Sequence, residues 1–272
     1  MALLSNTNYY SNAIIGTPGL GSDIDLYQTT TTPKYQIGFG FTRADGNHYR
    51  YGQFTAIANR GNLVSPVTSE CDQTEILKAG ALVANLVPQG NEIMNSNAIG
   101  SRYAQLVVSA SANQFAGGYL TIASGTGFGF TYRIKGNDTT ASKVTGNTFF
   151  NLYDPIQVAL DSNSCVTISS SRFVSLTPAN TLTATCVQVA GVTVTNNSAN
   201  SYGWICTGGK IGVLQDASIA ASGKPVYLST TTAGAIAGYA NVQGSNPAFA
   251  MVGYMASPGS STEYSVIYMN IE

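Results

Sequence analysis

Charged side chains are scarce in this sequence. Only 9% of its 272 residues are Asp, Glu, Lys or Arg, and the formal net charge at pH 7 is −1, whereas ordinary soluble domains contain about 25% charged residues. Phosphate binding needs a concentrated basic face, so this balance argues against nucleic acid as the main ligand. Neutral polar surfaces with short side chains favour close subunit packing or repeated contacts.

Long apolar runs and leader-like segments are also missing. Eighteen consecutive apolar residues occur nowhere, and the nearest approach, Ile76–Val87, is interrupted by Lys78, Gly80 and Asn85. No membrane-spanning helix is therefore expected. The first residues have neither a basic start nor a sustained apolar stretch. We expect a protein made in the cytoplasm, without a membrane partner.

Histidine and paired cysteines, the usual residues of catalytic and zinc sites, are nearly absent. A Ser–His–Asp or Cys–His arrangement would have to use His48, the single histidine. His48 closely follows a predicted Asp45-Gly46 turn, so we expect it to be exposed or packed on tyrosine. The four cysteines form no C-x-x-C pair and are predicted to be free core thiols: Cys71, Cys165, Cys186 and Cys206.

Other sequence patterns for chemistry are incomplete. Gly208–Ile211 lacks the upstream glycine and the Ser or Thr of a phosphate-binding loop, and Gly125–Gly129 lies between two predicted strands. The carboxylate pairs Asp23/Asp25 and Asp72/Glu75 lie in no recognisable ligand loop. Asp154 precedes a proline and is predicted to be a turn residue. We expect no enzyme, no cofactor and no metal.

What the sequence does contain is β-strand pattern. Tyr119–Ala123 predicts a strand, Ser124–Gly127 a turn, and Phe128–Lys135 a return strand whose apolar residues alternate with polar ones or glycine. This alternation places Phe128, Phe130, Tyr132 and Ile134 on one face.

A second hairpin is predicted from Tyr35 to Tyr51. Aromatic and apolar residues alternate through Phe41, Asp45-Gly46 is a strong two-residue turn signal, and Tyr49 and Tyr51 continue on the return strand. Thr74–Leu86 could form a helix, although Gly80 weakens the pattern.

The remaining strands are short and lie at spacings near ten residues. They are predicted at Tyr103–Ser109, Phe149–Leu160, Thr183–Val189, Val192–Thr195, Trp204–Thr207, Gly212–Leu214, Val226–Ser229, Ala250–Met255 and Tyr264–Ile271. Such spacing favours an all-β sandwich or barrel with at most one or two short helices. Trp204, the only tryptophan, is expected in the core.

The chain divides by composition into an arm and a body. Residues 1–34 are rich in Ser, Asn, Thr, Gly and Pro and show no periodicity, so they form either an extended arm over a neighbouring subunit or a disordered tail. As an arm they would use anchors at Tyr9, Tyr10, Ile14 and Ile15.

Residues 35–272 form the β-rich body. An Ile-Ala-x-x-Gly-x-x-Val pattern recurs within Ala56–Val64 and Ala217–Val226, which suggests that 35–68 and 200–272 form one barrel. The 103–160 hairpins would then be a subdomain inserted into it.

Several of these segments resemble a family when they are taken in order. The segments are Asp45–Tyr49, Ala56–Ala58, Asn113–Leu120, Tyr132–Asn137, Leu152–Pro155, Tyr202–Trp204, Gly223–Ser229, Thr232–Gly234 and Val252–Gly253. Together they resemble virion structural proteins of tailed bacteriophages, and in particular head decoration (cement) proteins.

The resemblance implies binding surfaces and no catalytic residues. It implies a protein on the outer capsid surface whose partners are the major capsid protein and further copies of itself, with a homotrimer as the expected form. It does not cover residues 1–34. A phage tail or fibre protein, and a carbohydrate-binding or adhesion module, are the alternatives.

Overall fold

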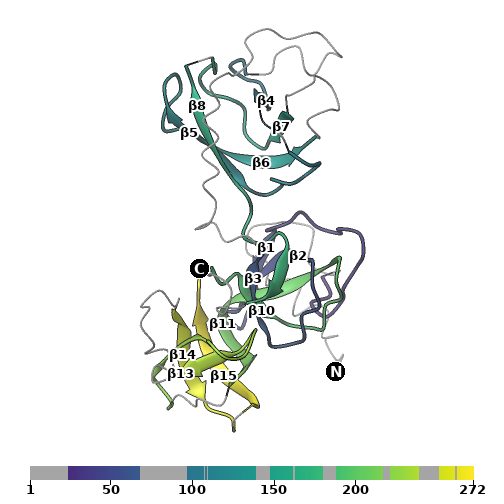
Figure 1. Cartoon of the computed structure of the whole chain (residues 1–272), viewed down its shortest axis with the longest axis vertical. Helices are drawn as coiled ribbons and strands as arrows, with labels where there is room; N and C mark the ends of the chain where they lie inside the picture. The colour runs from purple at the N-terminus through teal and green to yellow at the C-terminus, as the bar shows by residue number, and fades with distance from the viewer. Residues whose placement is uncertain are drawn as a thin grey trace, which may run out of the picture. The chain divides into compact units, whose positions relative to one another are not determined.

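The chain folds into β-structure in two compact units. The computed structural model describes residues 24–67, 97–106, 108, 110–138, 148–161, 163–179, 188–216, 221–238, 251–260 and 262–272. These ranges contain fifteen strands and no helix, which confirms the expected all-β class. Unit 1 comprises the described residues of Met1–Asp72 and Arg172–Glu272, and unit 2 those of Gln73–Ser171 (Figure 1). Among the described residues, none lies in a helix long and apolar enough to cross a bilayer.

Unit 1 is built on a ten-stranded sheet. Its strands are β1 (Gly40–Thr42), β2 (His48–Phe54), β3 (Leu63–Pro66), β9 (Leu176–Pro178), β10 (Gly191–Thr193), β11 (Ser201–Leu214), β12 (Pro225–Leu228), β13 (Ile236–Gly238), β14 (Met251–Ser257) and β15 (Tyr264–Asn270). They pair in the order β1-β2-β9-β3-β10-β11-β15-β14-β12-β13.

The fourteen-residue strand β11 pairs with three other strands of this sheet, β2, β10 and β15. Its first half pairs with β2, its second half with β15, and Ile205 and Cys206 also pair with β10. The β2–β11 pairing places residues 48–54 beside 201–208. The β2–β9 link is one parallel pair, Phe54 with Leu176, so the pairings run in a cycle from β11 through β10, β3, β9 and β2 and back to β11.

The first hairpin forms where its turn signal predicts. Gly46 has a φ of +83°, which glycine adopts without steric cost. The Asp45 carboxylate accepts a hydrogen bond from the Asn47 N–H at 3.0 Å, as in an Asx-turn. β1 and β2 then pair with Phe41 opposite Tyr49. The hairpin is therefore set by local turn chemistry and presents its aromatic residues to the core.

Trp204 is the centre of an aromatic cluster in unit 1. The side chain is 1% exposed, which confirms its predicted core position. Phe41 meets it edge-to-face with ring centroids 4.9 Å apart, and Tyr35 and Tyr51 each lie at 5.2 Å. Such pairs add about 0.5–1.5 kcal/mol each beyond their area burial, so this cluster fastens the hairpin to β11.

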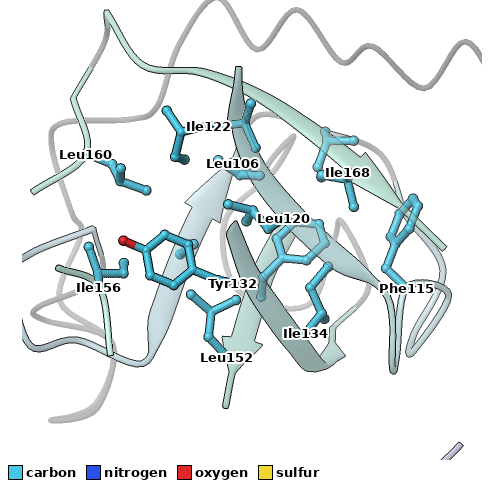
Figure 2. Close-up of a cluster of buried hydrophobic side chains, with 14 of the residues drawn as sticks. Leu106, Phe115, Leu120, Ile122, Tyr132, Ile134, Leu152, Ile156, Leu160 and Ile168 are labelled. Carbon is cyan, nitrogen blue, oxygen red and sulfur yellow. The ribbon is translucent and has the colours of Figure 1, made fainter. Parts of the chain in front are cut away.

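Unit 2 is a five-stranded antiparallel sheet with its own core. Its strands are β4 (Tyr103–Leu106), β5 (Tyr119–Ser124), β6 (Thr131–Asn137), β7 (Thr148–Leu152) and β8 (Cys165–Ser169), paired in the order β4-β7-β6-β5-β8. Figure 2 shows the core side chains, among them Leu120, Ile134 and Leu152, converging between the strands. Alternate residues of β5 and β6 point into this core, as their period of two predicts.

The start of the return strand was predicted too early. Phe128 and Phe130 were expected on the core face, but β6 begins at Thr131, and the two rings are 74% and 38% exposed. The reason is three glycines at alternate positions, Gly125, Gly127 and Gly129, each with a φ near +80°. These left-handed residues keep the chain turning until Thr131.

Some sequence predictions lie outside the described residues. These are the anchors Tyr9, Tyr10, Ile14 and Ile15, the helix at Thr74–Leu86, and the cysteines Cys71 and Cys186. Of the other two cysteines, Cys165 is half-buried and Cys206 is buried, and both are free thiols.

Candidate contact surface

The outward face of β12, β14, β15 and β11 carries exposed aromatic side chains. Along β14 and β15, alternate residues such as Val252 and Ile267 enter the apolar core of unit 1, so their neighbours point outward. The large exposed side chains among them are Met251, Tyr254, Tyr264 and Tyr268, between 42% and 55% exposed. β14 and β15 are drawn in yellow beside the green β11 in Figure 1.

Strand register places several of these side chains in one row across the four strands. Pro225 of β12 lies opposite Tyr254 of β14, Tyr254 opposite Tyr268 of β15, and Tyr268 opposite Lys210 of β11. The Lys210 Nζ lies 5.8 Å from the Tyr268 ring centroid, within range of a cation–π contact. Adjacent strands are about 4.8 Å apart, so the row spans about 14 Å.

Further residues extend the row along the strands. Tyr227 lies opposite Met251, and Tyr264 lies opposite Leu214. The Tyr264 hydroxyl donates a hydrogen bond to the Arg60 carbonyl oxygen at 2.9 Å, which holds the ring in place. We call this surface the tyrosine face and define it by its residues: Lys210, Leu214, Pro225, Tyr227, Met251, Tyr254, Tyr264, Val266 and Tyr268.

The tyrosine face combines a large aromatic area with little charge. Lys210 is the only charged residue among those that define it. Tyrosine offers a large, rigid area with a polar tip and loses little conformational entropy on binding. The face can therefore bind a largely uncharged partner through ring contacts and hydroxyl hydrogen bonds.

His48 and Cys206 have no catalytic geometry. His48 is exposed on β2, and its Nδ1 lies 2.9 Å from the Thr42 hydroxyl oxygen on the paired strand. Cys206 is buried, and burial raises the pKa of its thiol to about 12. A thiol with that pKa is not a nucleophile at neutral pH.

Two polar clusters in unit 1 connect its strands. Asp216, 2% exposed, accepts hydrogen bonds from the hydroxyls of Ser229 at 2.6 Å and Thr231 at 3.4 Å, which ties the end of β11 to the turn after β12. Ser229 also accepts the N–H groups of Thr231 and Thr232. Every one of these contacts fixes a turn, so we interpret the cluster as structural.

The second cluster surrounds Glu272. Its carboxylate accepts hydrogen bonds from Arg50 Nε at 2.9 and 3.1 Å, from Arg172 Nη2 at 2.5 Å and from the Thr207 hydroxyl at 3.1 Å. Burial acts to raise the pKa of Glu272, but the hydrogen bonds and charges of Arg50 and Arg172 outweigh it and lower the pKa. The cluster joins the end of the chain to β2 and β11.

The predicted site residues and the observed surface do not coincide. The four anchors of the arm lie outside the described residues, and the tyrosine face was not singled out from the sequence, although its strands were. No three His, Cys, Asp or Glu side chains within the described ranges come together as a metal site. Asp154 is exposed, two residues after the end of β7.

Comparison with known proteins gives no relative. No protein-family model matches the chain, and searches of curated proteins and of solved structures find no significant match.

Proposed function

We propose that this chain is a structural virion protein of a tailed bacteriophage, a head decoration (cement) protein that binds the outer surface of the major capsid protein lattice. The observation that carries the proposal is the tyrosine face, an exposed and nearly uncharged aromatic surface on a rigid sheet. The order of short motifs that resembles decoration proteins supports the same role. A single charge on this face, that of Lys210, gives little attraction for phosphates.

The size of the tyrosine face indicates how such a protein would bind. About 14 Å across the strands and about 20 Å along β15 give about 300 Å², against about 800 Å² per partner in a stable interface. One face alone would bind weakly. Linked copies make the second and third contacts intramolecular, so a homo-oligomer, with a trimer as the expected form, would hold the lattice firmly.

Binding to head particles assembled without this protein tests the proposal. Tyr254→Ser combined with Tyr268→Ser removes the centre of the row, and we expect at least a tenfold loss of affinity in sedimentation with the particles, because central tyrosines are frequent binding hot spots. Tyr119→Ser is the matched control, since Tyr119 lies on β5 of unit 2 and is 48% exposed, against 47% for Tyr254.

The possible results test the proposed function and the proposed binding surface separately. Failure of the wild-type chain to bind the particles would remove the proposed function. Binding of the double variant at wild-type strength would retain the function and remove the tyrosine face as its surface. Binding only to tail structures would favour a tail or fibre protein.

A carbohydrate-binding module is the second candidate, and the same exposed tyrosines favour it. Sugar rings stack their C–H faces on aromatic side chains, and a flat sheet face can accommodate a chain of them. Sugar sites also need several convergent polar groups, which on this face are limited to Lys210 and the tyrosine hydroxyls. Binding on a glycan array that is lost in the Tyr254/Tyr268 double variant would establish this candidate instead.

A further inference from the structure

The outward face of the unit 2 sheet carries an arginine that has no carboxylate partner. The guanidinium carbon of Arg133 on β6 lies 5.5 Å from the ring centroid of Tyr153, the residue after β7. The Arg133 Nε is buried and has no hydrogen-bond partner among the described residues. The other half-buried arginines of the described ranges each pair with a carboxylate: Arg43, Arg50 and Arg172. Burying a charge without a counter-ion is costly, so an anion bound at Arg133 would complete its environment.

The described part of unit 2 does not supply this anion. No carboxylate there forms an ion pair with Arg133. Asp138, the residue after β6, accepts the Phe149 N–H at 2.8 Å, and Asp154 is exposed. Burial raises the pKa of the Tyr153 hydroxyl, which therefore stays neutral at pH 7. The anion would have to come from a ligand.

Strand register places a tyrosine beside Arg133 on the same face. Tyr119 of β5 lies opposite Arg133 on one side and opposite Ser169 of β8 on the other. Tyr119 is 48% exposed, so its ring is available for contact. The residues that alternate with these enter the core on the other side of the sheet, as Figure 2 shows for Leu120, Tyr132 and Ile168.

Hydroxyl groups lie next to this pair. Thr121 of β5 is opposite Thr131 of β6 and Thr167 of β8, and the hydroxyl oxygens of Thr121 and Thr131 are 3.1 Å apart. Lys135, two residues after Arg133 on β6, is exposed and adds a second cation. We call this surface the arginine face and define it by its residues: Tyr119, Thr121, Thr131, Arg133, Tyr153 and Ser169.

The side chains of the arginine face match a sugar that carries a carboxylate. The planar guanidinium of arginine binds a carboxylate through two parallel hydrogen bonds. An exposed tyrosine ring stacks on the C–H face of a sugar ring, and threonine and serine hydroxyls both donate to and accept from sugar hydroxyls. Such polar groups are what the tyrosine face has few of. Nucleic acid is bound by a series of cations along its backbone, whereas Arg133 and Lys135 give only two.

We propose that the arginine face binds a carboxylate-bearing sugar of a glycan, with the carboxylate on Arg133 and the sugar ring on Tyr119. The sugar hydroxyls bind Thr121, Thr131 and Ser169. The row from Ser169 to Tyr153 crosses four strands, or about 14 Å, which leaves room for a neighbouring sugar. This binding function is additional to the proposed contact with the capsid lattice and does not depend on what the tyrosine face binds.

An array of glycans containing uronic or sialic acid, together with sulfated and neutral glycans, tests the proposal on the purified full chain. We expect binding to carboxylate-bearing glycans. The glycan that binds most tightly is then titrated beside its methyl ester, which keeps the ring and the hydroxyls but removes the charge. We expect the dissociation constant to rise at least tenfold for the ester, and at least tenfold for the acid with Arg133→Gln, because both changes remove hydrogen bonds between charged groups.

Matched variants separate this face from general effects of charge and aromatic area. Tyr119→Ser should bind several-fold more weakly, and Tyr254→Ser is its control, because Tyr254 is 47% exposed on the tyrosine face. Arg60→Gln, which changes an exposed arginine of unit 1, should bind like wild type. Arg133→Lys keeps the charge without the planar fork, so its affinity should fall between those of wild type and Arg133→Gln. Unchanged hydrogen exchange over Tyr119–Asn137 verifies folding, and the comparison of acid with ester needs only the wild-type chain.

Several results would overturn the proposal. These are no binding to any carboxylate-bearing glycan, an ester that binds as tightly as the acid, or Arg133→Gln that binds like wild type. Binding lost in Tyr254→Ser and retained in Tyr119→Ser would place the glycan on the tyrosine face instead. Oligothymidylate or polyglutamate that binds through Arg133 as tightly as the glycan would assign the face to nucleic acid or to an acidic peptide. Binding of head particles is measured separately, so either proposal can fail without the other.

Discussion

Replacing Gly125 by alanine should destabilise unit 2 far more than the same replacement at Gly129. Both residues have left-handed backbones, with φ of +79° and +86°. A Cβ on Gly125 would lie 1.8 Å from the carbonyl oxygen of Asn163 and 2.6 Å from its carbonyl carbon, whereas at Gly129 no neighbouring atom lies within 4 Å. Comparing the two alanine variants therefore separates the cost of a backbone clash, present only at Gly125, from the cost of the left-handed conformation, present at both positions.

The expected free energies follow from the contacts that the clash would break. The left-handed conformation costs alanine about 1–2 kcal/mol at either position. At Gly125 the Asn163 backbone must also move. This movement would break two hydrogen bonds, from the Thr126 hydroxyl to the Asp161 carboxylate (2.9 Å) and from the Ser164 hydroxyl to the Thr126 carbonyl oxygen (2.8 Å). A hydrogen bond to a carboxylate contributes about 1.5–3 kcal/mol and a neutral one about 0.5–1.5 kcal/mol. We expect a loss of about 1–2 kcal/mol for Gly129→Ala and about 3–6 kcal/mol for Gly125→Ala.

The two units allow an internal control in this experiment. Trp204 is the only tryptophan and lies in unit 1, so its fluorescence in a urea titration follows unit 1. Hydrogen exchange of peptides covering Tyr119–Asn137 follows unit 2. We expect Gly125→Ala to accelerate exchange in unit 2 and to leave the Trp204 transition unchanged. If Gly125→Ala and Gly129→Ala accelerated exchange equally, the clash argument would be refuted. If Gly125→Ala destabilised the Trp204 transition as much as it destabilises unit 2, separate unfolding of the two units would be refuted.

Two further predictions concern unit 1. Glu272→Gln should lower the free energy of unfolding by about 1–3 kcal/mol at pH 7, because it removes the carboxylate between Arg50 and Arg172. The folded-state pKa of Glu272 lies below the ordinary value of 4.5, so the stability that its carboxylate contributes is complete above pH 4.5 and is lost as the pH falls through the lowered pKa. The free energies of unfolding of wild type and variant should therefore converge in acid. A difference that stays constant down to low pH would contradict this role of Glu272. Cys206, whose pKa burial raises to about 12, should resist a thiol reagent in the folded protein while the half-buried Cys165 reacts. Mass spectrometry of labelled peptides measures this, and labelling of Cys206 at the rate of Cys165 would contradict it.

Local patterns were sufficient to predict much of the fold. The Asp45-Gly46 turn, the alternation in β5 and β6, and the strand at Tyr264 each follow from a few neighbouring residues. Such patterns fail where a glycine allows close approach of another chain segment and does not end a strand. Trp204–Thr207 and Gly212–Leu214 were predicted as separate strands because Gly208 and Gly209 suggested a break, but the structure has one continuous β11.

The glycines of β11 serve close approach instead of a turn. The register of β2 and β11 shifts between Cys206 and Gly208, and Gly209 has a φ of +96°. A Cβ there would lie 2.1 Å from the Asn47 side-chain oxygen, which accepts the Lys210 N–H at 2.8 Å. Sequence alone could not distinguish this β-bulge from a turn, because both favour glycine and differ only in what approaches them.

The tyrosine face could not be predicted for a related reason. On β15 the outward residues Tyr264 and Tyr268 alternate with the inward Ile267 and Met269, so both faces of the strand are apolar or aromatic. Period-two alternation reveals the buried face only when the other face is polar. The other strands of unit 1 determine which face of β15 is buried, because their Val213, Val226 and Val252 pack on its inward side.

The scarcity of charge is a property of the surface that the fold itself does not require. Each unit has a buried apolar core, and the described residues contain three ion pairs, all in unit 1 and all partly exposed. Exposed ion pairs contribute about 0–1 kcal/mol, so additional charge on the surface would have cost the cores nothing. Additional charge would instead oppose association through the tyrosine face, because it would surround that face with groups that must lose water on contact. The low charge content therefore favours the contact role that we propose for the tyrosine face.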